Sequence, residues 1–178
     1  VYDYFGISVS SAGDLNSDGY SDVIVGAYSY GADNNGRAYI FYGGSSPDNT
    51  ADVIMTGEAA NDLFGFSVSS AGDLNGDGYS DVIVGAIWYG ASNDGRAYIF
   101  YGSSSPDNTA DVIMTGETTG DHFGRSVSSA GDFNGDGYSD VIVGANGYPG
   151  ITYQGRSYIF YGGSSPDNTA DVIMTGEA

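Results

Sequence analysis

One pattern of oxygen-bearing side chains, D-x-N-x-D-G-Y-x-D, occurs three times in the chain. Oxygen ligands at positions 1, 3 and 5, followed by glycine at position 6, let a short loop wrap a hard cation. The glycine permits a positive φ, so the position-7 carbonyl can turn inward, and the aspartate at position 9 closes the shell. The pattern predicts one Ca²⁺ per copy, three per chain, held by Asp14, Asn16, Asp18, Tyr20 and Asp22; by Asp73, Asn75, Asp77, Tyr79 and Asp81; and by Asp132, Asn134, Asp136, Tyr138 and Asp140.

Other interpretations fit this pattern less well. An EF-hand needs glutamate at position 12, where this chain has Val25, Val84 and Val143. A plain β-turn of Asp, Asn and Gly would not need three carboxylates in nine residues, because they repel one another without a cation. Zinc is disfavoured, since the chain has no cysteine and only His122. Mg²⁺ remains an alternative, although it prefers near-ideal octahedral sites with retained waters.

The charge balance excludes several classes of function. The 178 residues include 4 Lys+Arg and 23 Asp+Glu, for a formal net charge of −19. Such an acidic surface repels nucleic acid and anionic membranes. No stretch is long and apolar enough for membrane insertion. The opening residues VYDYFG carry no basic or apolar leader, so no signal peptide is expected in this chain.

The calcium-type pattern belongs to a longer repeat with a period of 59 residues. The units are 1–59, 60–118 and 119–178, and the third has one extra residue between Gly144 and Gly155. The first two units are identical at 48 positions, which indicates recent duplication, deliberate engineering or excision from a longer array.

Each unit is expected to form four strands, in the first unit 5–12, 21–27, 37–43 and 51–57, because apolar and small polar residues alternate between turn-forming separators. Repeats of this size predict an all-β chain of antiparallel meanders packed as propeller blades. A β-solenoid is the alternative, but its coils are much shorter.

Three elements in order resemble the FG-GAP repeat, which builds the seven-bladed propeller of integrin α subunits and related bacterial surface proteins. They are a Phe-Gly pair, the calcium-type loop and V-I-V-G-A; the Phe-Gly pairs are Phe5-Gly6, Phe64-Gly65 and Phe123-Gly124. The resemblance implies a calcium loop between the first and second strands of each blade and an extracellular or cell-surface location. The chain departs from it in having three blades and no proline after G-A, where Tyr28, Ile87 and Asn146 stand.

Differences between the units gather at the strand connections opposite the calcium-type loops. This end is a candidate contact surface for a protein or glycan ligand, and it carries Tyr30, Trp88, Tyr89, His122, Arg125 and Tyr148. The alternative is that this end merely tolerates change. A structural role is expected for Arg37, Arg96 and Arg156, which follow a glycine at the start of the third strand and can pair with carboxylates.

Three functions are compatible with these features to different degrees. A non-enzymatic, calcium-stabilised propeller module that assembles with itself is favoured. An integrin-like adhesion or glycan-binding protein is the alternative. A hydrolase is disfavoured, since no acid–base pair occurs only once. Three blades leave two apolar faces open and propellers close with about four to eight blades, so we expect a homodimer with six blades. A fragment of a longer array would instead give monomers or mixed oligomers.

Overall fold

The computed structural model describes residues 2–149 and 154–177, which contain twelve strands and no helix. None of these residues belongs to an apolar helix of membrane-spanning length. The strands are β1 (Ser8–Gly13), β2 (Asp22–Ala27), β3 (Arg37–Phe41), β4 (Val53–Thr56), β5 (Phe64–Gly72), β6 (Asp81–Ala86), β7 (Arg96–Phe100), β8 (Val112–Thr115), β9 (Phe123–Gly131), β10 (Asp140–Ala145), β11 (Arg156–Phe160) and β12 (Val172–Thr175).

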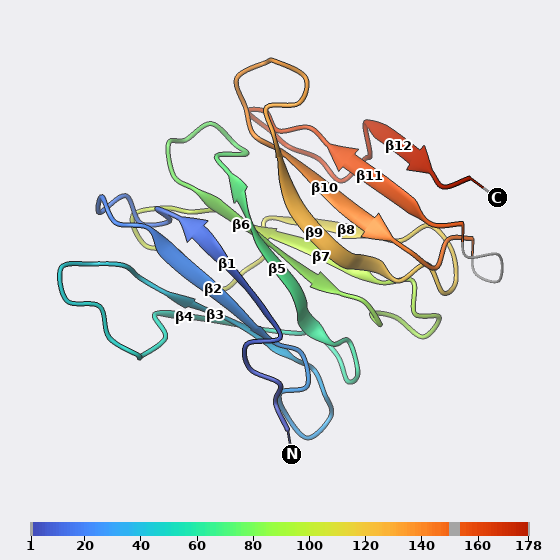
Figure 1. Cartoon of the computed structure of the whole chain (residues 1–178), viewed down its shortest axis with the longest axis horizontal. Coiled ribbons are helices and arrows are strands. Elements are labelled where there is room, and N and C mark those ends of the chain that lie inside the picture. Colours follow the sequence, from blue (N-terminus) through green and yellow to red (C-terminus); the bar gives the residue numbers. More distant parts are fainter. Residues whose placement is uncertain (1, 150–153, 178) are drawn as a thin grey trace.

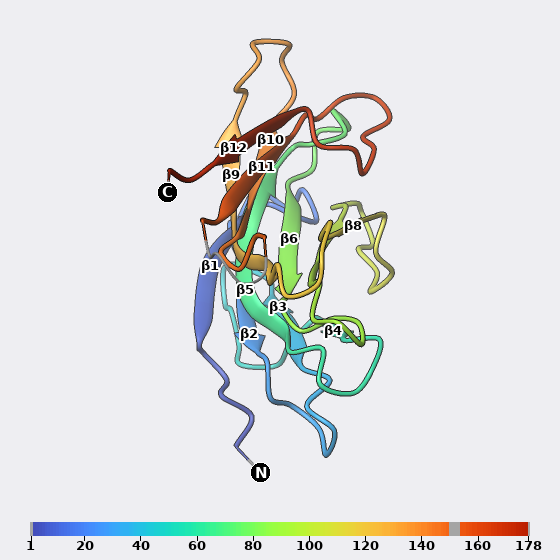
Figure 2. The same cartoon turned by 90° about the vertical axis from the view of Figure 1, so that its right-hand side faces the viewer.

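The strands form three antiparallel sheets of four, with the orders β1-β2-β3-β4, β5-β6-β7-β8 and β9-β10-β11-β12. Each sheet is a meander in which consecutive strands are neighbours, as expected of a propeller blade. The predicted all-β class and the blade architecture are confirmed. The first strands of the three blades lie side by side (Figure 1). In the side view, β1 and β5 lie on one side and β4 and β8 on the opposite side (Figure 2).

The hydrophobic cores lie between the blades. One buried cluster joins side chains of the first and second blades, such as Ile24 and Met55 with Phe64 and Tyr98. A second cluster joins the second and third blades in the same way. Because a thin four-stranded sheet has two apolar faces, each blade needs a neighbour on both sides to bury them.

The middle blade shows what two neighbours do for a strand. Every residue of β6 is buried, whereas its counterpart β2 alternates, and Val23 in β2 is 46% exposed. The two strands share the sequence D-V-I-V-G-A. Their different burial therefore comes from the neighbouring blade alone.

The first strand of the first blade is shorter than expected. The sequence predicted a strand from Phe5, but β1 begins at Ser8, whereas β5 and β9 begin at the equivalent Phe64 and Phe123. Those two phenylalanines form parallel bridges to Gly36 and Gly95 of the preceding blade. Among the described residues no blade precedes Phe5, so its segment lacks the partner that extends the strand.

Adjacent blades touch backbone to backbone through glycine. A Cβ built on Gly26 would lie 2.0 Å from the Gly65 carbonyl oxygen, and a Cβ on Gly85 would lie 2.0 Å from that of Gly124. Real Cβ atoms do not approach so closely, so only glycine fits. The Phe-Gly pair of one blade thus packs on the V-I-V-G-A strand of the previous blade.

Candidate metal centre and ligand-binding end

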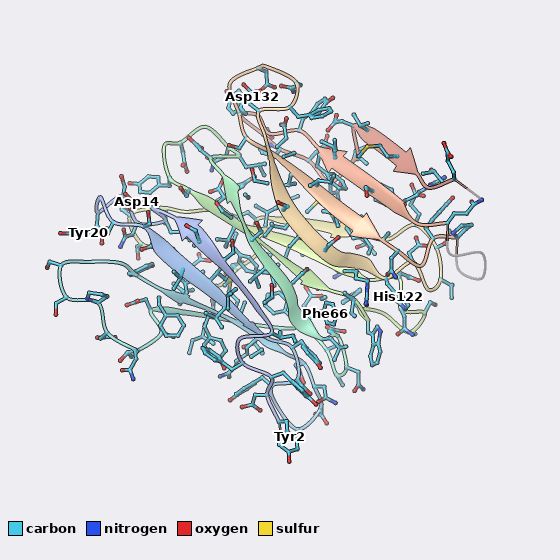
Figure 3. The ribbon with its side chains drawn as sticks, in the orientation of Figure 1. Tyr2, Asp14, Tyr20, Phe66, His122 and Asp132 are labelled. Carbon is cyan, nitrogen blue, oxygen red and sulfur yellow. The ribbon has the colours of Figure 1, made fainter. Side chains whose placement is uncertain are left out.

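The three calcium-type loops connect the first and second strands of each blade and lie at one end of the molecule. Figure 3 labels Asp14 and Tyr20 in the first loop and Asp132 in the third. In the first loop, the Asp14 carboxylate accepts hydrogen bonds from the Asp18 and Gly19 N–H groups at 3.1 and 2.9 Å. The Asn16 side-chain amide donates to Asp18 at 3.1 Å. The same contacts recur in the other two loops.

The position-9 aspartate lies at the base of each loop. Asp22 is buried, and its two oxygens accept the Leu15 and Gly43 N–H groups, each at 2.8 Å. Asp81 and Asp140 make the equivalent bonds. This carboxylate therefore connects the loop to the segment that follows the third strand. The sequence pattern did not predict this structural role.

The environment of Asp81 is costly for a negative charge. Burial raises the pKa of its carboxyl group to about 7, although the Gly102 and Leu74 N–H groups oppose the rise. The nearby carboxylates of Asp77 and Asp73 raise the pKa further. The carboxylates of one loop are thus close enough to repel one another.

The donor set of each loop fits a hard cation, because the predicted ligands offer only oxygen and include three carboxylates. Among the residues that the structure describes, however, no three acidic or histidine side chains are arranged as a ready-made metal site. Instead the carboxylates accept hydrogen bonds from N–H groups of the loop and its base. The predicted residues are therefore brought together, but not in a coordinating arrangement.

The candidate ligand residues lie at the opposite end, where Figure 3 labels Phe66 and His122. Each of the three tyrosines in this set lies under an arginine of its own blade, at distances of 3.6 to 3.8 Å from the guanidinium carbon to the ring centroid: Tyr30 under Arg37, Tyr89 under Arg96 and Tyr148 under Arg156. Such stacking holds the tyrosines in place. Trp88 is 45% exposed, and Arg125 lies over the Phe66 ring. Trp88, His122 and Arg125 are therefore the members of the set outside these stacks.

Two of the arginines pair with carboxylates, as expected. Arg96 bonds Glu58 at 2.8 Å and Arg156 bonds Glu117 at 2.6 Å. Each glutamate belongs to the preceding blade, a partner that the sequence reading did not identify. Within the described residues, Arg37 has no such ion pair.

The sequence profile of the FG-GAP repeat matches residues 5–41, 64–100 and 123–160. The chain belongs to the FG-GAP repeat family. Each match begins at a Phe-Gly pair and covers the calcium-type loop and the second and third strands. The family segment therefore includes the Phe-Gly pair and the V-I-V-G-A glycine that touch between blades.

FG-GAP proteins similar to this chain include integrin α chains. The chain is 35% identical to integrin alpha-5 of Xenopus laevis over 169 residues, which cover 88% of this chain and 16% of that protein. It is 39% identical to integrin alpha-IIb of Mus musculus over 156 residues, covering 81% of this chain and 15% of that protein. The repeats are thus similar to those of integrin α chains, and the chain spans about one-sixth of the length of these relatives.

Proposed function

We propose that this FG-GAP chain is a non-enzymatic, calcium-stabilised β-propeller module that acts in adhesion or protein interaction outside the cell. The observation that carries the proposal is the threefold occurrence of an oxygen-only loop at one end of propeller blades related to those of integrin α chains. The three repeat units act as the blades, residues 1–59, 60–118 and 119–178.

Calcium would be held in each loop by the side chains at positions 1, 3, 5 and 9 and by the position-7 carbonyl, in the first loop those of Asp14, Asn16, Asp18, Asp22 and Tyr20. The ion supplies positive charge to carboxylates that otherwise repel one another. Asp22 and its counterparts keep each loop attached to the blade through the two backbone N–H groups that they accept.

A calcium titration tests this proposal. We expect isothermal titration calorimetry to saturate at three ions per chain, and Asp77→Ala to reduce the number to two, because it removes one carboxylate from one loop. Asp107→Ala is the matched control: Asp107 lies in the turn between β7 and β8, where it accepts the Thr109 N–H group. Saturation below two ions in the unmodified chain would contradict the proposal.

We also propose that the end opposite the calcium loops contacts the partner, through Trp88 with His122 and Arg125. An exposed tryptophan on a rigid scaffold is a common anchor of binding surfaces. We expect signals on arrays of glycans and of extracellular matrix proteins to fall at least about tenfold in Trp88→Ala. Asp107→Ala, in the turn between β7 and β8, is again the control and should bind as before. Equal signals from Trp88→Ala and the unmodified chain would exclude this surface.

Self-association completes the proposed module. The residues that the structure describes form two blade-to-blade cores, and one face of the first blade and one face of the third have no neighbour among them. Two chains supply six blades, which lies within the range that closes a propeller. The proposed assembly is therefore a homodimer with one six-bladed ring.

A further inference from the structure

An open hollow of about 690 Å³ is lined by residues of the third blade and by Phe66 of the second blade. Three glycines, Gly144, Gly155 and Gly176, line it together with Met174 and Arg156. Inside the chain, the three atoms nearest to a Cβ on Gly144 all belong to Ser126. Gly144 therefore lacks the close backbone contact that Gly26 and Gly85 make with the next blade.

The same three glycine positions in the first blade contact a Phe-Gly pair. A Cβ on Gly26 would lie 2.0 Å from the Gly65 oxygen, and a Cβ on Gly36 would lie 2.1 Å from the Phe64 oxygen. A Cβ on Gly57 would lie 2.8 Å from that of Phe64. The first blade thus forms a socket that Phe64-Gly65 fills, and the hollow on the third blade is the same socket.

The second blade repeats this contact with the third. Gly85 faces the Gly124 oxygen and Gly95 faces the Phe123 oxygen, with an added Cβ at 2.0 and 2.2 Å. The Phe123 N–H group also donates to the Asp94 carbonyl oxygen at 3.0 Å, as the Phe64 N–H group does to that of Asn35. One docking geometry therefore occurs twice within the chain.

The matching Phe-Gly pair at the other end of the chain contacts no other blade among the described residues. Phe5 is 58% exposed, whereas Phe64 and Phe123 are 2% exposed. Gly6 has no atom within 4 Å of an added Cβ. The exposed Phe5 is therefore the uncovered equivalent of two buried residues.

The third blade exposes the residues that the other two blades cover with a Phe-Gly pair. Met174 is 42% exposed, whereas the equivalent Met55 and Met114 are 1% exposed. The two open faces also carry opposite charges at the positions that form ion pairs inside the chain. Glu177 stands at the position of Glu58 and Glu117, and Arg37 stands at the position of Arg96 and Arg156, which pair with those glutamates. Glu177 and Arg37 lie on the two open faces, so neither can reach the other inside one chain.

We propose that Phe5-Gly6 of one copy enters the hollow over Gly144 of a second copy, where Glu177 pairs with the incoming Arg37. The contact has the same geometry as the two internal ones. It joins unlike faces, so two copies close head to tail with two identical new interfaces. This inference rests on the proposed six-bladed ring and assigns its contact residues.

A charge-swap mixture tests the assignment, because a head-to-tail ring has an unusual symmetry. In an Arg37→Glu homodimer both new interfaces place two glutamates together, and in a Glu177→Arg homodimer both place two arginines together. When the two variants are mixed, one interface carries the exchanged pair and the other carries the original pair. We expect the dissociation constant of each variant alone to rise at least about tenfold, and that of the mixture to return to within about threefold of the unmodified chain. Light scattering and native mass spectrometry measure this.

Gly144→Ala provides a second variant that should keep the fold, since the atom nearest to its methyl group is the Ser126 side-chain hydroxyl, which can rotate away. In the proposed contact the methyl group would collide with the Gly6 carbonyl oxygen of the second copy. We expect a monomer that still binds calcium as the unmodified chain does.

The outcomes separate this inference from the proposed function. A measured mass of about 18.4 kDa for the unmodified chain, at micromolar concentration with calcium, would mean a monomer and overturn both the ring and the contact. The number of calcium ions bound is measured separately, so the proposed calcium sites would not be affected. A dimer that both Gly144→Ala and the charge-swap variants leave intact would overturn the contact but not self-association. A mixture that is no tighter than either charge variant would overturn the head-to-tail arrangement.

Discussion

Calcium removal is expected to reduce the free energy of unfolding by about 8 kcal/mol, since each of three sites contributes about 2.7 kcal/mol at free calcium 100-fold above Kd. This loss is comparable to the whole stability of a typical domain, about 5–15 kcal/mol. The physical reason lies in the loops. Burial raises the pKa of the Asp22 carboxyl group, and the nearby carboxylates of Asp18 and Asp14 raise it further, so the carboxylates repel one another without a cation.

Thermal unfolding followed by circular dichroism, with excess calcium and with excess chelator, measures this effect. The melting temperature should fall by tens of degrees in chelator and return when calcium is restored. Magnesium at the same concentration is the control for nonspecific screening and should restore much less. An unchanged melting curve in excess chelator would refute the prediction.

Gly85→Ala is expected to destabilise the chain by about 3 kcal/mol or more, at the upper end of overpacking effects. The new methyl group would lie 2.0 Å from the Gly124 carbonyl oxygen of the next blade. Gly85 is paired with Ser67, and Gly124 lies in β9 between the paired residues Phe123 and Ser126, so neither can move away cheaply. The contact between the second and third blades would open.

Gly144→Ala is the matched control, because it makes the same change at the same place in the repeated V-I-V-G-A strand. An added Cβ on either glycine would lie 2.4 Å from a serine hydroxyl, that of Ser67 for Gly85 and that of Ser126 for Gly144. Within the described residues, no blade follows Gly144. Urea unfolding at concentrations where both variants are monomeric should give a much smaller loss for Gly144→Ala. Equal losses would mean that the contact between blades is not the cause.

Much of the fold follows from local patterns in the sequence. The period of 59 residues and the alternation of apolar residues predicted three four-stranded meanders, and the Phe-Gly, loop and V-I-V-G-A order predicted the FG-GAP family. The oxygen-rich loops are also found where predicted, between the first and second strands. These features depend on residues that are close together in the sequence, so the sequence of a single repeat is enough to predict them.

Features that depend on distant contacts were not predictable in the same way. The backbone partners of Asp22 lie both within its loop and beyond the third strand. The carboxylates that pair with Arg96 and Arg156 come from the preceding blade. The packing role of glycine in V-I-V-G-A needs the position of the next blade, although its presence in all three units was a visible signal.

Phe5 and Phe64 show which features the sequence determines and which only the tertiary structure determines. The sequence by itself determined that each unit carries the same Phe-Gly pair near its start and forms the same blade. Only the tertiary structure decided that Phe64 is buried and extends its strand while Phe5 is exposed and does not. The physical reason is that the socket for each pair lies on another blade, so identical residues have different environments according to whether that blade is present.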